Sequence, residues 1–191
     1  MESRVFMIGF LLIQLQFAAA QIEVAHQRVV FLPQSSVTRI PSPDEKWTLV
    51  FECPDNCTER KLSIEDSASH KRRLVNKYER SLSISWSPDS HFFFVNDIFG
   101  SNGALSYLYD PVTLKTTDLE KVLVAGDRDA TQFLKAGHQY LEAKRWLNSQ
   151  ELLVVLFGHF DEPPARGFSL QYRIGLDGSV HKISQSKREG S

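Results

Sequence analysis

Apolar and polar residues alternate along several short stretches of the chain, and this pattern predicts β-strands. The clearest stretch is 81–86, in which Leu82, Ile84 and Trp86 are separated by serines. A period of two places alternate side chains on opposite faces, so we expect this strand to bury one face. Runs of aromatic and β-branched residues, such as 92–95, predict further strands.

This strand pattern occurs in three copies. Residues 42–52 carry a Ser-Pro-Asp turn, two polar residues, an aromatic residue and an apolar run, and residues 87–97 repeat this order. Proline presets the backbone of such a turn, and the aspartate can bond to nearby amides. A weaker third copy begins at Trp146, with Asn148 and Ser149 in place of the proline and the aspartate.

Each copy is expected to supply four strands, one before the turn and three after it. The strands around the repeated runs are predicted at 28–32 or 37–40, 61–65 and 71–75 in the first copy; at 81–86, 105–109 and from 114 in the second; and at 140–146, 168–174 and 179–183 in the third. A four-stranded unit of roughly 45 to 60 residues has the size of one β-propeller blade.

The sequence therefore predicts an all-β protein of three propeller-like, four-stranded antiparallel blades in an open or incomplete arrangement. Closed propellers have about 4 to 8 blades, so a compact sandwich or a ring completed by several chains stays an alternative to a monomeric open arc. One short helix is expected at 130–136. The domain is predicted to span 21–184, followed by a flexible tail at 185–191.

The second copy carries Trp86-Ser87-Pro88-Asp89 before an aromatic-rich strand, and Tyr107-Leu108-Tyr109-Asp110 further on. These motifs resemble a blade of the TolB-type β-propeller repeat, and similar blades occur in the propeller domains of prolyl-oligopeptidase-type peptidases. The resemblance extends over most of residues 28–184. It implies a radial stack of four-stranded sheets, in which the turn motif is structural and carries no catalytic residue.

The first 20 residues have the features of a cleaved bacterial signal peptide. Arg4 precedes an apolar run at 5–15, small residues occupy 18–20, and Gln21 would begin the mature chain. The apolar run is shorter than the roughly 20 residues of a membrane span, so an N-terminal anchor is the less favoured alternative. The mature chain is expected to be periplasmic or secreted, with no membrane span.

Cys53 and Cys57 are the two cysteines of the chain. In an oxidising compartment such a close pair predicts a disulfide that closes a short loop. A zinc site would need further ligands, and a redox motif would need a Cys-x-x-Cys spacing. The near balance of 22 basic and 23 acidic residues gives no reason to expect nucleic acid as a partner.

Three loops that follow the repeated strands, at 52–58, 96–103 and 158–167, are expected to leave from one edge of the assembly. The second and third are long for hairpins, and loops of this kind often bind ligands. An alternative is that they are plain solvated loops. The candidate binding residues in them are Asn96, Asp97, Phe99, His159, Asp161, Glu162 and Arg166.

No metal or cofactor is expected. His159, Asp161 and Glu162 carry suitable ligand atoms, with Asp97 as a further candidate, but three of them are too close in sequence to surround an ion alone. No catalytic residue is predicted either. The chain has no Gly-x-Ser-x-Gly elbow and no glycine-rich phosphate loop, and His138 has no recognisable nucleophile beside it.

Trp47, Trp86 and Trp146 lie at or near equivalent repeat positions, which favours packing between sheets over stacking on sugars. The function predicted is therefore an exported, non-catalytic binding or accessory protein, whose partner is a protein or a glycan and which could self-associate. A glycan-acting enzyme with acidic loops and a structural component of an envelope assembly are the alternatives. Clustering of the loop acids in a pocket would favour the enzyme, and a flat apolar face at one end of the arc would favour assembly.

Overall fold

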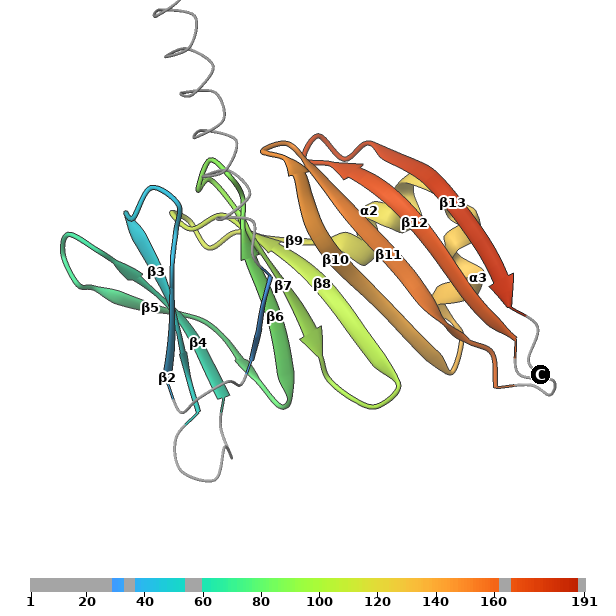
Figure 1. Ribbon diagram of the computed structural model, residues 1–191, viewed down its shortest axis with the longest axis horizontal. Coiled ribbons are helices and arrows are strands. Elements are labelled where there is room, and N and C mark those ends of the chain that lie inside the picture. The colour runs from blue at the N-terminus through green and yellow to red at the C-terminus, as the bar shows by residue number, and fades with distance from the viewer. Residues whose placement is uncertain (1–28, 33–36, 54–59, 162–165, 189–191) are drawn as a thin grey trace, which may run out of the picture.

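The computed structural model describes residues 29–32, 37–53, 60–161 and 166–188. Within them the strands form a four-stranded sheet and a nine-stranded sheet. The larger sheet consists of two four-stranded units and strand β1, and the units join where β10 runs briefly parallel to β8. Figure 1 shows three units side by side, which we name the first, second and third blades.

Neighbouring strands within each blade are antiparallel. The first blade consists of β2 (Val37–Pro41), β3 (Trp47–Glu52), β4 (Arg60–Asp66) and β5 (Arg72–Tyr78). The second consists of β6 (Ser81–Trp86), β7 (Phe93–Ile98), β8 (Gly103–Tyr109) and β9 (Thr116–Asp118). The third consists of β10 (His138–Asn148), β11 (Glu151–His159), β12 (Gly167–Gly175) and β13 (Val180–Arg188). The all-β, open arrangement of blades is thus confirmed.

The predicted strands are found close to their expected bounds. Of the two alternatives for the start of the first blade, β2 is the strand that pairs with β3. Strand β1 (Val30–Leu32) instead pairs with β6 and extends the second blade. Strand β13 continues to Arg188, past the point at which the sequence predicts the domain to end.

The two Ser-Pro-Asp turns have the same hydrogen bonds. Ser42 Oγ donates to Asp44 Oδ1 over 2.7 Å and accepts from Trp47 N over 3.1 Å. Ser87 Oγ donates to Asp89 Oδ1 over 2.7 Å and accepts from Phe92 N over 3.0 Å. In each turn the serine and aspartate side chains satisfy backbone amides that a tight turn leaves free, which explains why the pattern repeats.

The core lies in two layers between the blades. Between the first and second blades pack residues that include Phe51, Ile64 and Trp86, and between the second and third pack residues that include Phe94 and Trp146. Trp86 and Trp146 are almost fully buried, which confirms that they pack between sheets. Trp86 Nε1 donates to Ile40 O, and Trp146 Nε1 donates to Ser85 O, so each indole is bonded to the preceding blade.

Helices cover the inner side of the third blade, behind β12 and β13 in Figure 1. The predicted helix at 130–136 is found as a single turn, α3 (Thr131–Leu134), after a 3₁₀ turn at Arg128–Ala130. A longer helix, α2 (Leu119–Gly126), was not predicted. It begins where the Asp118 carboxylate accepts from Glu120 N and Lys121 N, an N-cap that follows directly on strand β9.

Several predictions concern the N-terminal part of the chain. The signal sequence at 1–20 and Cys57 lie outside the described residues, so export and the disulfide stay predictions. Cys53 is buried at the end of β3. No helix among the described residues is long and apolar enough to cross a membrane.

Candidate binding site on the third blade

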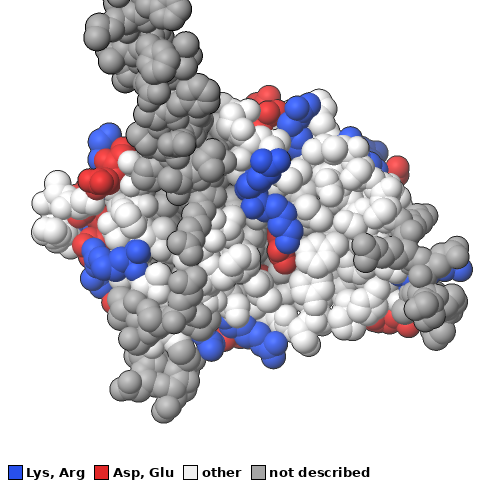
Figure 2. Space-filling view, viewed as in Figure 1, with Lys and Arg blue, Asp and Glu red and all other residues white. Residues whose placement is uncertain are grey.

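The third blade has one packed face and one outer face. Along β11 the residues Leu152, Val154 and Leu156 are buried, whereas alternate residues such as Val155 and Phe157 are partly exposed. Successive side chains of a strand point to opposite faces, so the buried and the partly exposed residues of β11 lie on opposite sides of the sheet. The outer face is turned toward the viewer in Figures 1 and 2, and few charged side chains cover it.

Two stacked pairs of rings lie across β10 and β11 on this face. The strand register pairs His138 with His159 and Tyr140 with Phe157. The imidazole centroids are 4.1 Å apart with an interplanar angle of 16°, and the Tyr140 and Phe157 centroids are 5.0 Å apart at 15°. Cross-strand pairs of this kind stabilise a sheet and also fix the rings in place.

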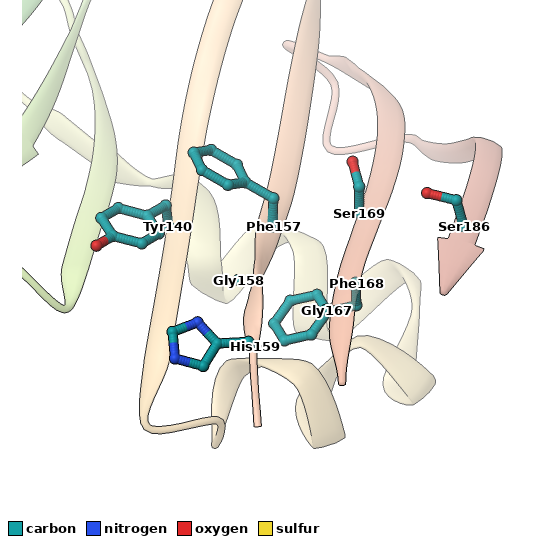
Figure 3. Close-up of a pocket in the computed structure, with 8 residues that line it drawn as sticks. All are labelled: Tyr140, Phe157, Gly158, His159, Gly167, Phe168, Ser169 and Ser186. Atoms are coloured by element: carbon teal, nitrogen blue, oxygen red, sulfur yellow. The ribbon is translucent and has the colours of Figure 1, made fainter. Parts of the chain in front are cut away.

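A shallow pocket of about 510 Å³ opens beside these rings, as Figure 3 shows. Its walls combine aromatic rings with the hydroxyl groups of two serines on β12 and β13. The lining residues are Tyr140, Phe157, Gly158, His159, Gly167, Phe168, Ser169 and Ser186. Apolar walls with a few polar groups are typical of a binding surface.

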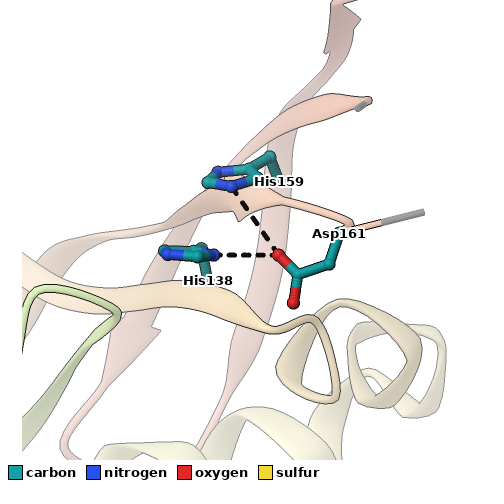
Figure 4. A group of neighbouring side chains, drawn as sticks. All are labelled: His138, His159 and Asp161. Carbon is teal, nitrogen blue, oxygen red and sulfur yellow. Dashed lines mark hydrogen bonds and ion pairs between the residues drawn. The ribbon is translucent and has the colours of Figure 1, made fainter. Parts of the chain in front are cut away.

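The carboxylate of Asp161 lies against both imidazoles at the end of the ring pairs (Figure 4). Its Oδ1 is 2.9 Å from His138 Nδ1 and 3.8 Å from His159 Nε2. Gly137 makes this approach possible, because a Cβ atom there would lie 1.5 Å from Asp161 Oδ2. The three side chains are partly exposed and therefore open to small solutes.

Only some of the predicted site residues lie together in the structure. His159 and Asp161 do come together, and His138, for which no partner was predicted, joins them. Phe99 is 39% exposed and packs over Gly103, where a Cβ atom would lie 2.4 Å from its ring. Arg166 is exposed, and its carbonyl accepts a hydrogen bond from Phe160 N. Glu162 lies outside the described residues.

The predicted loop placement of Asn96 and Asp97 is wrong, because strand β7 continues through both residues to Ile98. Asn96 is buried, and its amide bonds to Ser83 Oγ and to the backbone of Ala143. It therefore joins blades and is not available to a ligand.

Asp97 is half-buried in the second blade and does not line the pocket. Among the described residues, no group donates a hydrogen bond to its buried Oδ1 atom. Burial, together with the negative charge of Glu79, raises the pKa of Asp97 to about 6. Its environment therefore disfavours the charged form.

Tyr140, Phe157, Ser169 and Ser186 line the pocket although they were not predicted as site residues. They lie within strands, whereas the predicted site residues were assigned to loops. The available signal was the alternation along 151–159, in which the residues between the buried leucines and valines include aromatic side chains.

No protein-family model matches the chain, and no curated protein matches it by sequence. Two similar structures are those of Pyrococcus horikoshii acylaminoacyl peptidase (TM-score 0.46, 13% identity, 80% of this chain and 25% of that one) and of TolB from Acinetobacter baumannii (TM-score 0.35, 12% identity, 83% and 44%).

A third solved structure is similar enough to show the fold. The β-propeller domain of the Trilobed protease from Pyrococcus furiosus, which has an open velcro topology, aligns with 78% of this chain at a TM-score of 0.52 and 13% identity. The chain covers 43% of that structure. The described residues therefore have a β-propeller-like fold, and the chain spans less than half the length of the propeller domain it matches.

Proposed function

We propose that this chain is an exported, non-catalytic binding protein that holds a protein partner on the outer face of its third blade. The observation that carries the proposal is an uncharged strip on that face, made of apolar and aromatic side chains and bordered by the Glu142–Lys144 ion pair. Tyr140, Leu153, Val155 and Phe157 are all partly exposed there, and none belongs to either core layer. No helix or strand of the described residues packs on this strip.

Packing within the chain supports a protein as the partner. The second blade and helices α2 and α3 together cover the inner face of the third blade, and an apolar layer holds these parts together. A propeller stacks its blades face to face, so the outer face of the third blade is the position at which another sheet would pack. An apolar patch rimmed by polar groups is typical of an interaction surface, and exposed Lys144, Gln171 and Arg173 supply that rim.

The outer face of the first blade has a different character. Glu65 lies there between Arg39 and Arg72, with both oxygen-to-nitrogen distances at 2.6 Å, and Arg72 also reaches Glu52 over 2.8 Å. Hydrogen bonds from Arg39 and then Arg72 lower the pKa of Glu65 to about 2. The charges on this face are paired with one another, so the face offers less to an apolar partner than the third blade does.

The enzyme alternative has less support. A glycan-acting enzyme of the kind considered would use acids from neighbouring loops, such as Asp97 and Asp161. Asp97 lies in a strand of the second blade, and Asp161 is engaged by two histidines. The described residues therefore do not bring these two acids into one pocket.

Site-specific photo-crosslinking in the envelope fraction of the native host tests the proposal. A photoreactive residue at Val155 is expected to give one discrete product, and the additional substitution Phe157→Glu is expected to remove it. A photoreactive residue at Val112, an apolar position in the β8–β9 turn that is 63% exposed, serves as the control. Identical products from both positions, or no product from Val155, would overturn the proposal. A product of twice the chain mass would identify the partner as a second copy.

A further inference from the structure

Two histidines and an aspartate meet at the edge of the third blade, and the strand register is what brings them together. His138 is the first residue of β10, His159 is the last residue of β11, and the two are paired across the strands. Asp161 follows two residues later and turns back toward both rings, as Figure 4 shows. We infer that these three side chains form a binding site for a divalent transition-metal ion of the zinc type.

The spacing of the ligand atoms is suited to a single ion. One nitrogen from each imidazole and one Asp161 oxygen all lie within 4.8 Å of one another. Ligands at 2.0–2.1 Å in a tetrahedral zinc site are about 3.4 Å apart. His138 Nδ1 and Asp161 Oδ1 are already 2.9 Å apart, and Asp161 Oδ1 and His159 Nε2 are 3.8 Å apart. These two separations lie on either side of the tetrahedral value.

The donor set selects the class of ion. Imidazole nitrogens suit zinc, copper and nickel, whereas calcium and magnesium prefer sites made of oxygen atoms. Two histidines and a carboxylate supply three ligands, which leaves a fourth position for water or for a group from a partner. All three side chains are partly exposed, between 37% and 59%, so an ion can reach them from solvent.

The backbone around the three side chains holds them in this arrangement. A Cβ atom at Gly158 would lie 2.0 Å from His138 O, so glycine permits the close approach of β10 and β11 at this point. A Cβ atom at Gly137 would collide with the Asp161 carboxylate. Phe160 packs on Phe133 and Phe168, with ring centroids 6.1 and 5.3 Å away, and so anchors the segment that carries Asp161. A site fixed in this way loses little freedom when it binds an ion.

This inference is separate from the proposed function. His138 and Asp161 do not line the pocket on the outer face, although His159 does. The test uses the metal ion alone and needs no partner, so either proposal can fail while the other stands.

The experiment is isothermal titration of Zn²⁺ into the purified chain, without a polyhistidine tag and in the presence of excess Ca²⁺. One zinc ion per chain is expected. His138→Ala is expected to weaken zinc binding by at least about tenfold, since even the loss of a group behind a metal ligand typically costs 10- to 100-fold. The matched control is His181→Ala, because His181 is exposed on β13 and lies outside the cluster.

A second variant tests the geometry without removing a ligand. Gly137→Ala must displace the Asp161 carboxylate and is expected to weaken zinc binding, while the visible spectrum of bound Co²⁺ should change. Denaturation midpoints confirm that each variant is folded. Zinc binding that is equally tight in His138→Ala, equally weakened in His181→Ala, or abolished by Ca²⁺ would overturn the inference.

Discussion

The side-chain amide of Asn96 makes two hydrogen bonds to the backbone of Ala143. Asn96 Nδ2 donates to Ala143 O, and Asn96 Oδ1 accepts from Ala143 N, each over 2.9 Å. This pair connects β7 of the second blade to β10 of the third, in a position where both residues are buried. Beyond the short parallel pairing of β8 with β10, this bidentate amide joins the second and third blades through a side chain.

Loss of the hydrogen bonds between Asn96 and Ala143 should destabilise the fold. Asn96→Ala is expected to lower the free energy of unfolding by about 3 kcal/mol, because it leaves the N–H and C=O groups of Ala143 buried without partners. Gln171→Ala removes an exposed amide from β12 and should change stability by less than about 0.5 kcal/mol. Urea denaturation of both variants measures the difference. Equal effects would show that the Asn96 bonds do not contribute.

Trp86→Ala is expected to destabilise the chain by about 3–5 kcal/mol. Its indole is 2% exposed, packs 5.0 Å from the Phe93 ring and donates to Ile40 O across the blades. Truncation removes this packing and leaves a cavity between the first two blades. Val112→Ala, at a site that is 63% exposed, is the control and should be nearly neutral. A neutral Trp86→Ala variant would contradict the packing of the first blade on the second.

The stability of the chain should depend on pH through Asp97. Its pKa is about 6 in the fold, against an ordinary value of 3.8, so the folded chain binds the proton more tightly than the unfolded chain does. Stability from this group is therefore full below about pH 4 and is lost as the pH rises through 6.

Asp97→Asn should remove that dependence. At pH 7 we expect the variant to be more stable than the original chain by about 1 kcal/mol, a value reduced for the partial exposure of the side chain. At pH 3.5 the two should be nearly equal. Denaturation at both values measures the change, and a variant that is less stable at pH 7 would show that the charged carboxylate has a favourable partner.

An exported chain is expected to have lost its signal sequence and to contain the Cys53–Cys57 disulfide. Mass spectrometry is expected to find an N-terminus at or near Gln21 and no free thiol at Cys53 or Cys57 before reduction. Reduction should lower stability by about 2 kcal/mol, since the loop between the cysteines is short. An uncleaved chain recovered from the cytoplasm, or two thiols that alkylate without reduction, would contradict these predictions.

The repeated turns made the blades predictable from sequence, because Ser42 and Ser87 satisfy the same local amides and do not depend on distant contacts. Helix α2 was missed since Leu119 and Leu123 are its only fully buried residues, too few to give a periodic pattern. The ring pairs depend on the register that places His138 opposite His159, and no local pattern specifies where β10 begins. Asn96 and Asp97 were misplaced because polar residues within a buried strand resemble a loop.

The unlike ends of the arc limit how copies of the chain can polymerise. A head-to-tail filament would press the uncharged strip around Val155 against Glu65 and its two arginines, and desolvating such a group costs several kcal/mol. Two copies that met through the same uncharged strip would instead form a twofold contact with no free strip left over. Growth would stop at a pair, so the charged end acts as a terminator of fibre formation.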